Sequence, residues 1–167
     1  MFITGATAGI GRAIAFKAAA AGFNILVSGR RKDRLDEVVA KIKQEHEVRA
    51  RGLCFDVRDQ AAVVQALKAE TATLEKCAVL VNNAGLARGA DFVQDGNQND
   101  WNEMLDTNVK GLLSVTSQVL PFLIRRGGGH IINMGSAAGR WVYPKGAVYC
   151  ASKHAVRAIS EGLRMDL

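Results

Sequence analysis

Residues 2–29, "FITGATAGIGRAIAFKAAAAGFNILVSG", set the pattern of the whole chain, because they predict a strand, a glycine-rich turn, a helix and a second strand in succession. Residues 2–4 are an extended start that runs into the turn. Residues 12–22 consist mainly of small residues, and Gly22 is expected to end this helix. Residues 23–29 form an apolar, β-branched run that is typical of a buried strand.

The same alternation continues along the rest of the chain. Apolar residues at helical spacing and short apolar runs predict helices over 32–46, 59–76, 101–126 (one helix or two) and 147–167, and strands over 48–57, 78–85 and 127–136. Short links between such elements leave few topologies other than a parallel sheet with helices on both faces. We therefore predict an α/β fold of five strands in a single domain, residues 1–167, with ligands bound beyond the carboxyl ends of the strands.

The composition is that of an ordinary globular domain. Of the 167 residues, 49% are hydrophobic and 23% are charged, a balance that does not favour disorder. Cys54, Cys77 and Cys150 are odd in number and lack C-x-x-C spacing, so we expect neither a disulfide framework nor a metal site. This cysteine pattern favours a cytoplasmic location. No apolar run or signal peptide indicates a membrane partner.

The net charge of +6 does not by itself indicate a nucleic-acid partner. Clustered Lys and Arg would favour one, but in residues 30–51, "RRKDRLDEVVAKIKQEHEVRAR", the basic residues alternate with acidic ones. No aromatic stacking motif or DNA-reading helix accompanies them. We therefore expect a small-molecule ligand and no nucleic acid.

The first strand-to-helix turn, "TGATAGIG" at residues 4–11, has the chemistry of a pyrophosphate cradle. Gly5, Gly9 and Gly11 would allow a sharp turn and a close phosphate approach, while free N–H groups at the helix N-terminus favour an anion. The spacing matches neither a P-loop nor the G-x-G-x-x-G fingerprint. The alternative is a glycine-rich turn that only packs the helix on the strand.

The second turn bears on the choice of dinucleotide. Arg30 and Arg31 follow the second strand, at the place where an NAD-binding domain usually has an acidic residue for the ribose 2′-hydroxyl. A guanidinium instead matches the oxygens of a 2′-phosphate. The pair therefore predicts a preference for NADP(H) over NAD(H), with solvated loop charges as the alternative.

The third and fourth turns could complete the dinucleotide site. Asp56, in "FDV" at residues 55–57, could accept a hydrogen bond from an adenine amino group, although a turn-forming Asp is an equal alternative. The turn "NNAG" at residues 82–85 is small enough for a flat ring to lie on its backbone, and its Asn side chains could hold neighbouring turns. A turn without any ligand is the alternative here.

Ser136, Tyr149 and Lys153 follow the fifth strand and would reach the same edge of the sheet. Tyr149 and Lys153 are four residues apart and would share one helix face. A nearby cation stabilises a tyrosine phenolate and makes the hydroxyl usable as a general acid or base. Each residue alone has a structural alternative, namely a helix cap for Ser136, a core residue for Tyr149 and a solvated charge for Lys153.

Taken together, "TGATAGIG", "NNAG", Asn108 in "DTNVKG", Ser136 in "GSAAG" and Tyr149-x-x-x-Lys153 resemble the short-chain dehydrogenase/reductase family over the whole chain. The resemblance implies a Rossmann-like, doubly wound parallel sheet, a nicotinamide cofactor, and a catalytic set of Asn108, Ser136, Tyr149 and Lys153. It also implies cofactor contacts at Gly5, Thr7, Gly9, Ile10, Gly11, Arg30, Arg31, Asp56, Val57, Asn83, Ala84, Gly85, Tyr149 and Lys153.

In the mechanism that the resemblance implies, Tyr149 exchanges a proton with the oxygen of an alcohol or carbonyl substrate while hydride moves to or from the nicotinamide. Lys153 supports Tyr149 and binds the nicotinamide ribose, and Ser136 hydrogen-bonds the substrate oxygen. Asn108 supports a water-linked proton path. Residues 82–113 and 128–153 look most similar to NADP-dependent 3-hydroxy acid dehydrogenases, which makes a small hydroxy acid such as serine a candidate substrate and residues 137–147 a pocket wall. Reductases of other alcohols share many of these motifs.

Two features depart from the family pattern. The first strand is reduced to "MFI", and the chain stops at Leu167, where family members continue with two further strands and a substrate loop. We therefore expect a truncated enzyme, which would form a homodimer or homotetramer when complete by pairing helices near residues 107–126 and 152–167. The alternative is a short NADP(H)-binding or interaction module without turnover.

Overall fold

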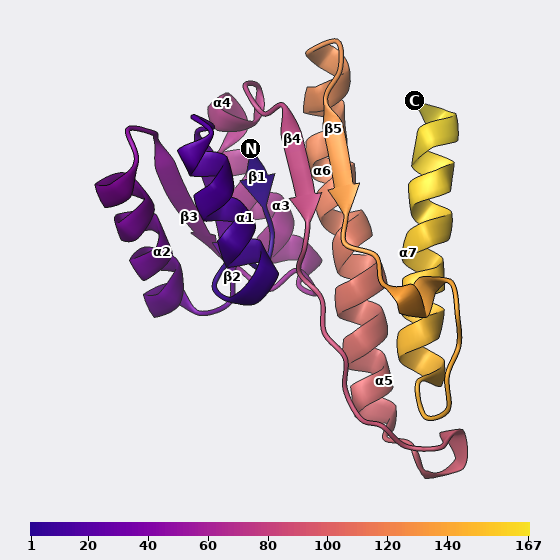
Figure 1. The fold of residues 1–167 in the computed structure, drawn as a ribbon. Coiled ribbons are helices and arrows are strands. Elements are labelled where there is room, and N and C mark those ends of the chain that lie inside the picture. The colour runs from indigo at the N-terminus through magenta and orange to yellow at the C-terminus, as the bar shows by residue number, and fades with distance from the viewer.

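The computed structural model describes residues 1–167 and contains a single five-stranded sheet. The strand order is β3-β2-β1-β4-β5 and all neighbours are parallel, with β1 (Phe2–Ile3), β2 (Ile25–Gly29), β3 (Ala50–Cys54), β4 (Val79–Asn82) and β5 (His130–Asn133). The order reverses between β1 and β4, so the sheet has a topological switch point there, where α/β sheets bind ligands. The expected α/β fold is confirmed (Figure 1).

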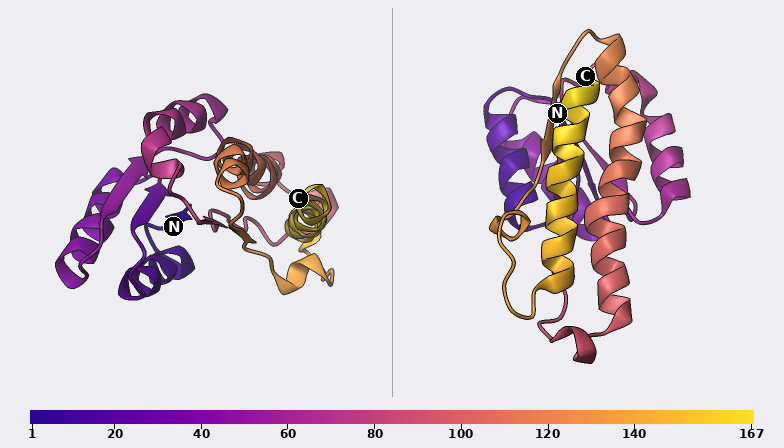
Figure 2. Two further views of the ribbon diagram at one scale, coloured as in Figure 1. Left: turned by 90° about the horizontal axis from the view of Figure 1, so that it is seen from above. Right: turned by 90° about the vertical axis from the view of Figure 1, so that its right-hand side faces the viewer.

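The helices connect these strands in sequence. They are α1 (Gly9–Ala20), α2 (Lys32–Glu45), α3 (Gln60–Ala69), α4 (Thr71–Leu74), α5 (Gln98–Leu105), α6 (Leu112–Arg125) and α7 (Ala147–Asp166). Short 3₁₀ turns lie at Val93–Asp95 and Ala137–Gly139. In Figures 1 and 2, α6 and α7 lie side by side, and α5 extends beyond the ends of the strands. None of the helices is long and apolar enough to cross a lipid bilayer.

Two hydrophobic cores cover the two faces of the sheet, because successive strand residues point to opposite faces. Ile3 belongs to the core that includes residues of α1 and α2. Its neighbour Phe2 belongs to the second core, with residues of α3 and α6. Both side chains are fully buried, so the two-residue strand β1 contributes to both layers.

The first helix ends where the sequence predicts. Gly22 has a φ of +83°, which a glycine adopts without strain, and its N–H donates to Ala19 O at 2.9 Å. The next N–H, of Phe23, donates to Ala18 O at 3.0 Å. These two bonds satisfy carbonyls that the helix end would leave unpaired.

The start of this helix differs from the prediction. Helix α1 begins at Gly9, so Gly9 and Gly11 belong to its first turn and only Gly5 lies in the preceding loop. Gly11 fits there because any Cβ would collide with Asn83 Nδ2 and Gly5 O. The expectation that all three glycines precede the helix was therefore wrong, and close packing of the helix on the turns is the reason.

The predicted helix over residues 59–76 is interrupted at Glu70, which caps α3 and precedes α4. The Glu70 side chain is buried, accepts a hydrogen bond from Thr73 Oγ1 at 2.7 Å, and pairs with Arg51 on β3 at 2.8 Å. This contact with a distant strand fixes the break. Strands β3 and β5 are also shorter than predicted, and β5 ends at Asn133, three residues before Ser136.

The helical stretch predicted over residues 101–126 consists of α5 and α6 joined by a π-helical turn at Asp106–Gly111. Leu105 at the end of α5 is 38% exposed, whereas its neighbour Met104 is buried. The wide turn adds one residue to the helical period, so α5 and α6 present differently phased faces to the rest of the protein. Such turns often occur at functional sites.

Candidate active site

A cleft of about 650 Å³ lies at the carboxyl ends of β1, β2 and β4, at the switch point of the sheet. Its walls come from all four predicted turns, from residues just after β5 and from the first two turns of α7. The structure brings together nearly all the predicted cofactor contacts, and the lining includes Gly5, Thr7, Gly9, Ile10, Arg30, Arg31, Asp56, Val57, Asn83, Ala84, Gly85, Tyr149 and Lys153. Gly11 is outside this lining and instead packs α1 against Asn83.

The N-terminus of α1 opens into this cleft without a side-chain cap. Ala8 is the N-cap residue and no side chain bonds to the first N–H groups, nor does the first turn hold an acidic residue. Gly9 and Ile10 line the cleft at this point. Unsatisfied N–H groups and the positive end of the helix dipole favour a phosphate, so the first turn fits the pyrophosphate of a dinucleotide.

The first and fourth turns are held against each other by Asn83 and Thr4. Asn83 Nδ2 donates to Thr4 O at 2.9 Å and to Gly5 O at 3.1 Å. Thr4 Oγ1 accepts from the N–H groups of Asn83 and Ala84 at 3.1 and 3.0 Å. A Cβ on Gly5 would lie 2.8 Å from Ala84 Cα, so the backbones themselves touch. The predicted role of an Asn side chain in joining neighbouring turns is confirmed for Asn83.

The two arginines of the second turn lie in different settings. Arg31 Nη2 donates to Thr7 Oγ1 at 2.9 Å and so bridges the first and second turns. The Arg30 side chain is 51% exposed, and Nη1 lies 3.6 Å from Asp56 Oδ2 and 3.6 Å from Glu103 Oε1. Neither is an isolated surface charge, and both line the cleft.

Asp56 is already held by arginines. Arg58 Nε and Nη2 donate to Asp56 Oδ2 at 3.0 and 2.7 Å, and Arg30 adds a looser ion pair. Burial alone would raise the pKa of Asp56, but hydrogen bonds and charge from Arg58 and Arg30 outweigh it and lower that pKa. A bond from an adenine amino group to this carboxylate would therefore be shared with Arg58.

Tyr149 and Lys153 lie on one face of α7, and both line the cleft. Lys153 Nζ is 5.9 Å from the centre of the Tyr149 ring and donates to Met134 O at 2.8 Å. Lys153 is only 8% exposed, and burial lowers its pKa below the ordinary lysine value. A charged group that is buried at this cost has a defined position beside the tyrosine.

Asn108 lies in the π-helical turn and is buried outside the cleft lining. Its Oδ1 accepts from Leu86 N–H at 2.8 Å, and its Nδ2 donates to Leu86 O at 2.8 Å and to Ser152 Oγ at 3.1 Å. Ser152 Oγ in turn donates to Tyr149 O at 2.7 Å. The amide thus joins the turn after β4 to the helix that carries the tyrosine.

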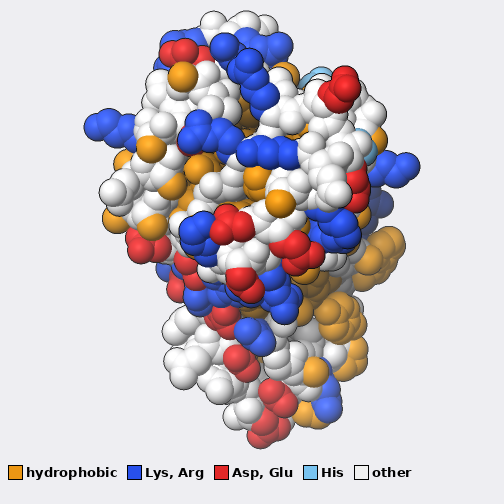
Figure 3. All heavy atoms as spheres, turned by 90° about the vertical axis from the view of Figure 1, so that its left-hand side faces the viewer, with side chains coloured by type: hydrophobic (Ala, Val, Ile, Leu, Met, Phe, Trp, Pro, Cys, Tyr) orange, Lys and Arg blue, Asp and Glu red, His pale blue; other side chains and the backbone are white.

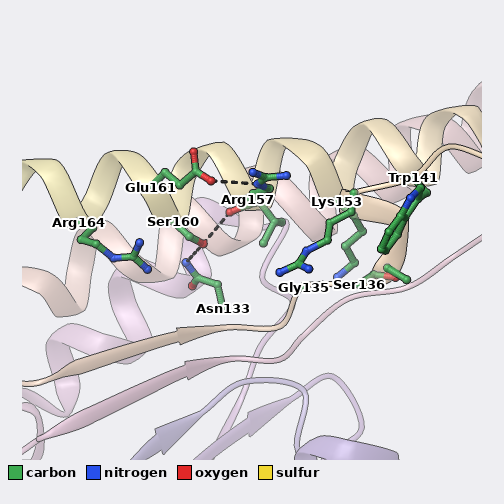
Figure 4. Close-up of a pocket in the computed structure, with 13 residues that line it drawn as sticks. Asn133, Gly135, Ser136, Trp141, Lys153, Arg157, Ser160, Glu161 and Arg164 are labelled. Atoms are coloured by element: carbon green, nitrogen blue, oxygen red, sulfur yellow. Dashed lines mark hydrogen bonds and ion pairs between the residues drawn. The ribbon is translucent and has the colours of Figure 1, made fainter.

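Ser136 lies in a neighbouring pocket of about 640 Å³, which shares Gly135 and Lys153 with the cleft. Its Oγ accepts from Ala138 N–H at 3.1 Å and caps the 3₁₀ turn Ala137–Gly139, as the structural alternative predicts. Figure 4 shows Ser136, Lys153 and Trp141 at one end of this pocket and Arg164 at the other. The structure therefore places Ser136 next to Lys153 but not in the lining of the main cleft.

Several residues around the site have no recognisable signal in the sequence. Thr4 and Ser152 read as ordinary small polar residues, yet both are buried and hydrogen-bonded to site elements. Glu103 reads as a solvated helix charge, yet it pairs with three arginines. Each of the three has a partner 15 to 80 residues away along the chain, which local patterns could not reveal.

A sequence model of the short chain dehydrogenase family matches residues 1–167. The chain belongs to this family. Among its curated members, sulfoacetaldehyde reductase 2 of Chromohalobacter salexigens is 45% identical over 168 residues, and the NADP-dependent 3-hydroxy acid dehydrogenase YdfG of Escherichia coli K12 is 41% identical over 167 residues. Both alignments cover the whole of this chain. It spans 66% of the length of each of these relatives.

Solved short chain dehydrogenases have the same fold. A serine dehydrogenase in its closed form, complexed with NADP+, superimposes with a TM-score of 0.91 at 42% identity. The match covers 99% of this chain and 65% of the serine dehydrogenase. The family resemblance predicted from the five motifs, including similarity to 3-hydroxy acid dehydrogenases, is thereby confirmed.

Proposed function

We propose that the protein is an oxidoreductase that transfers hydride between NADP(H) and a small alcohol or carbonyl compound, with Tyr149 as general acid and base. The observation that carries this proposal is the position of Tyr149 and Lys153 in the same cleft as the uncapped start of α1 and the Arg30–Arg31 pair. A phosphate-binding end and a proton-transfer end are thus arranged along one dinucleotide-sized groove. NADP-dependent relatives support the choice of cofactor.

Each residue of the proposed active site has a separate role in the reaction. The bound cofactor supplies the hydride chemistry. The Tyr149 hydroxyl gives a proton to the carbonyl oxygen during reduction and takes it back during oxidation. Lys153 holds a positive charge beside Tyr149, and Asn108 fixes the helix turn that carries it. The Ser136 hydroxyl accepts a hydrogen bond from Ala138 N–H, and its own O–H would donate to the substrate oxygen.

Cofactor preference gives a direct test. The wild-type protein should show a kcat/KM at least about tenfold higher with NADP+ than with NAD+. Arg30→Ala should lower kcat/KM for NADP+ by roughly 10- to 100-fold and leave that for NAD+ within about threefold, because a charge-assisted hydrogen bond to phosphate contributes about 1.5–3 kcal/mol. Steady-state kinetics with both cofactors measures this. Arg34→Ala, on the exposed side of α2, is the charge-matched control, and a wild-type preference for NAD+ would refute the proposal.

The substrate that we propose carries an acid group. The pocket that holds Ser136 and Lys153 is also lined by Arg140, Arg157 and Arg164, against a single acid, Glu161. Glu161 pairs with Arg157 at 3.0 Å, as Figure 4 shows, which leaves an excess of positive charge. The names of the relatives support an anionic substrate, since 3-hydroxy acids and sulfoacetaldehyde both bear acid groups.

Arg140 is the arginine nearest Ser136 in the chain, and its side chain has no ion pair or hydrogen bond in the structure. Arg140→Met should raise KM for a small 3-hydroxy acid about tenfold while KM for a neutral alcohol of the same size changes less than twofold, because only the acid loses a charge-assisted bond. Initial rates with matched acid and alcohol substrates measure the difference. An equal change in KM for the acid and the alcohol would contradict a role of Arg140 in acid recognition. Arg34→Met is the control for removal of a positive charge.

The alternative candidate function needs only the cofactor-binding residues of the cleft. It is an NADP(H)-binding module without turnover. A 17.9 kDa species, verified by intact mass, that binds NADP(H) and oxidises no alcohol would support this candidate over the enzyme.

Homodimer or homotetramer formation and a cytoplasmic location stay predictions. Figure 3 shows Lys and Arg side chains intermixed with Asp and Glu over one face, which supports a small-molecule ligand over nucleic acid.

A further inference from the structure

Glu103 on α5 is surrounded by three guanidinium groups that follow three different strands. Its Oε1 lies 3.6 Å from Nη1 of Arg30, after β2, and 3.4 Å from Nη1 of Arg58, after β3. Its Oε2 accepts a hydrogen bond from Nε of Arg88, after β4, at 2.9 Å. The Glu103 side chain is 19% exposed. One carboxylate thus connects three of the turns that form the cofactor cleft.

Arg30 differs from the other two arginines in how its donors are used. Arg58 bonds to Asp56 with two nitrogens, and Arg88 bonds to Glu103. Arg30 makes no side-chain hydrogen bond and lies between the two carboxylates at 3.6 Å from each. Its direction is therefore set by two charges while its N–H donors stay available to a ligand. Arg30 is also the member of these three that lines the cleft.

The charges of this cluster leave it attractive to an anion. Three arginines face two carboxylates, and the nearby Asp106 is paired with Lys110 at 2.8 Å, so the local balance is one positive charge even with all the acids ionised. Hydrogen bonding from Arg88, and then the charges of Arg88, Arg58 and Arg30, lower the pKa of Glu103 despite the opposing effect of burial. Glu103 is therefore ionised at neutral pH and can act as a fixed anchor for the arginines.

We propose that Glu103 is a positioning residue for NADP(H) selectivity, which holds the Arg30 guanidinium at the place where the adenosine 2′-phosphate would bind. This inference rests on the proposed function. An unrestrained Arg loses much rotamer freedom when it binds a ligand, and a partner that orders it beforehand removes that loss. The negative charge of Glu103 would also repel the phosphate, but three guanidiniums share that charge. We expect the ordering of Arg30 to contribute more than the repulsion between Glu103 and the phosphate. Removing the charge of Glu103 should therefore weaken NADP+ binding.

Glu103→Gln keeps the size of the side chain and removes its charge. The dissociation constant for NADP+ should rise about five- to tenfold, while that for NAD+ changes less than twofold and kcat at saturating NADP+ is unchanged. Calorimetric titration with both dinucleotides, and with adenosine 2′,5′-bisphosphate against adenosine 5′-monophosphate, isolates the phosphate. An unchanged or tighter NADP+ affinity, or an equal loss for both dinucleotides, would overturn the inference.

Two further variants separate positioning from general damage. Glu103→Asp retains the charge and should recover at least half of the lost NADP+ affinity, measured on the logarithmic scale. Equal losses in the Asp and Gln variants would count against a charge-based role. Glu75→Gln removes an exposed carboxylate outside the cleft and should leave both affinities unchanged.

The affinities of the wild type and of Glu103→Gln for the two dinucleotides test the cofactor preference and the role of Glu103 separately. If the wild-type protein binds NADP+ no better than NAD+, the proposed cofactor preference is wrong. If the wild type prefers NADP+ and Glu103→Gln retains the same ratio of affinities, the proposed function stands and only the role of Glu103 is refuted.

Discussion

Tyr149→Phe is expected to lower kcat at least about a hundredfold while the dissociation constant for NADPH stays within about twofold, because only the proton-transfer group is removed. The Tyr149 hydroxyl makes no hydrogen bond within the protein, so its loss leaves the fold without an unpaired group. The ring still lines the cleft and still packs beside Lys153. The loss should therefore be confined to the chemical step.

Steady-state kinetics at saturating substrate measures kcat, and fluorescence titration with NADPH measures the dissociation constant. Tyr143→Phe is the chemically matched comparison, since Tyr143 is exposed and outside the cofactor cleft, although it belongs to the predicted pocket wall of residues 137–147. Its kcat should therefore fall far less than that of Tyr149→Phe. If Tyr149→Phe retains the wild-type kcat, Tyr149 is not the general acid and base.

Lys153→Met should reduce kcat at least about a hundredfold and also raise KM for NADP(H), since it removes the only charge beside Tyr149 in the cleft. Met has nearly the same length and can fill the buried space. Steady-state kinetics measures both constants. Lys43→Met, on an exposed position of α2, is the control for charge removal, and a normal kcat in Lys153→Met would contradict the assignment.

The same substitution should change how stability depends on pH. Burial lowers the pKa of Lys153 below its ordinary value of 10.5, so at alkaline pH the unfolded chain binds more protons than the folded one. The free energy of unfolding of the wild type therefore gains a contribution as pH rises through the folded-state pKa towards 10.5. The Met variant lacks this contribution. In denaturant titrations, the free energy of unfolding of Lys153→Met minus that of the wild type should be largest near neutral pH and decrease in that alkaline window. A difference that does not change with pH would contradict the prediction.

The sequence predicts the layers of the fold because its signals are local. Gly22 ends α1 through bonds within the same turn, and the apolar runs at β2 and β4 need only alternate with helices to specify a parallel sheet. The break at Glu70 could not be predicted in this way, because it depends on Arg51 from another strand. The π-helical turn likewise depends on contacts that Asn108 makes with Leu86 and Ser152.

The candidate site likewise contains some features that local sequence signals predict and others that depend on contacts between distant segments. Arg30, Asn83 and Tyr149 could be placed together because the carboxyl ends of parallel strands meet at one edge of the sheet. The sequence could not show that Ser136 caps a 3₁₀ turn or that Glu103 gathers arginines from three turns. Those properties arise from side-chain geometry between segments, which no short motif encodes.

The π-helical turn at Asp106–Gly111 has a further consequence for how the chain tolerates changes in length. It holds one residue more than an α-helical turn, so deleting one residue within it would restore an uninterrupted α-helix and keep α5 and α6 in their present orientations. A deletion within the regular part of α5 or α6 would instead rotate the helix beyond it by about 100°. Either Glu103 would then leave its arginines, or Val115 and Val119 would leave the core. The π-helical turn is thus the one place in this helical stretch that can absorb the loss of a residue without disturbing either the cofactor side of the molecule or its hydrophobic interior.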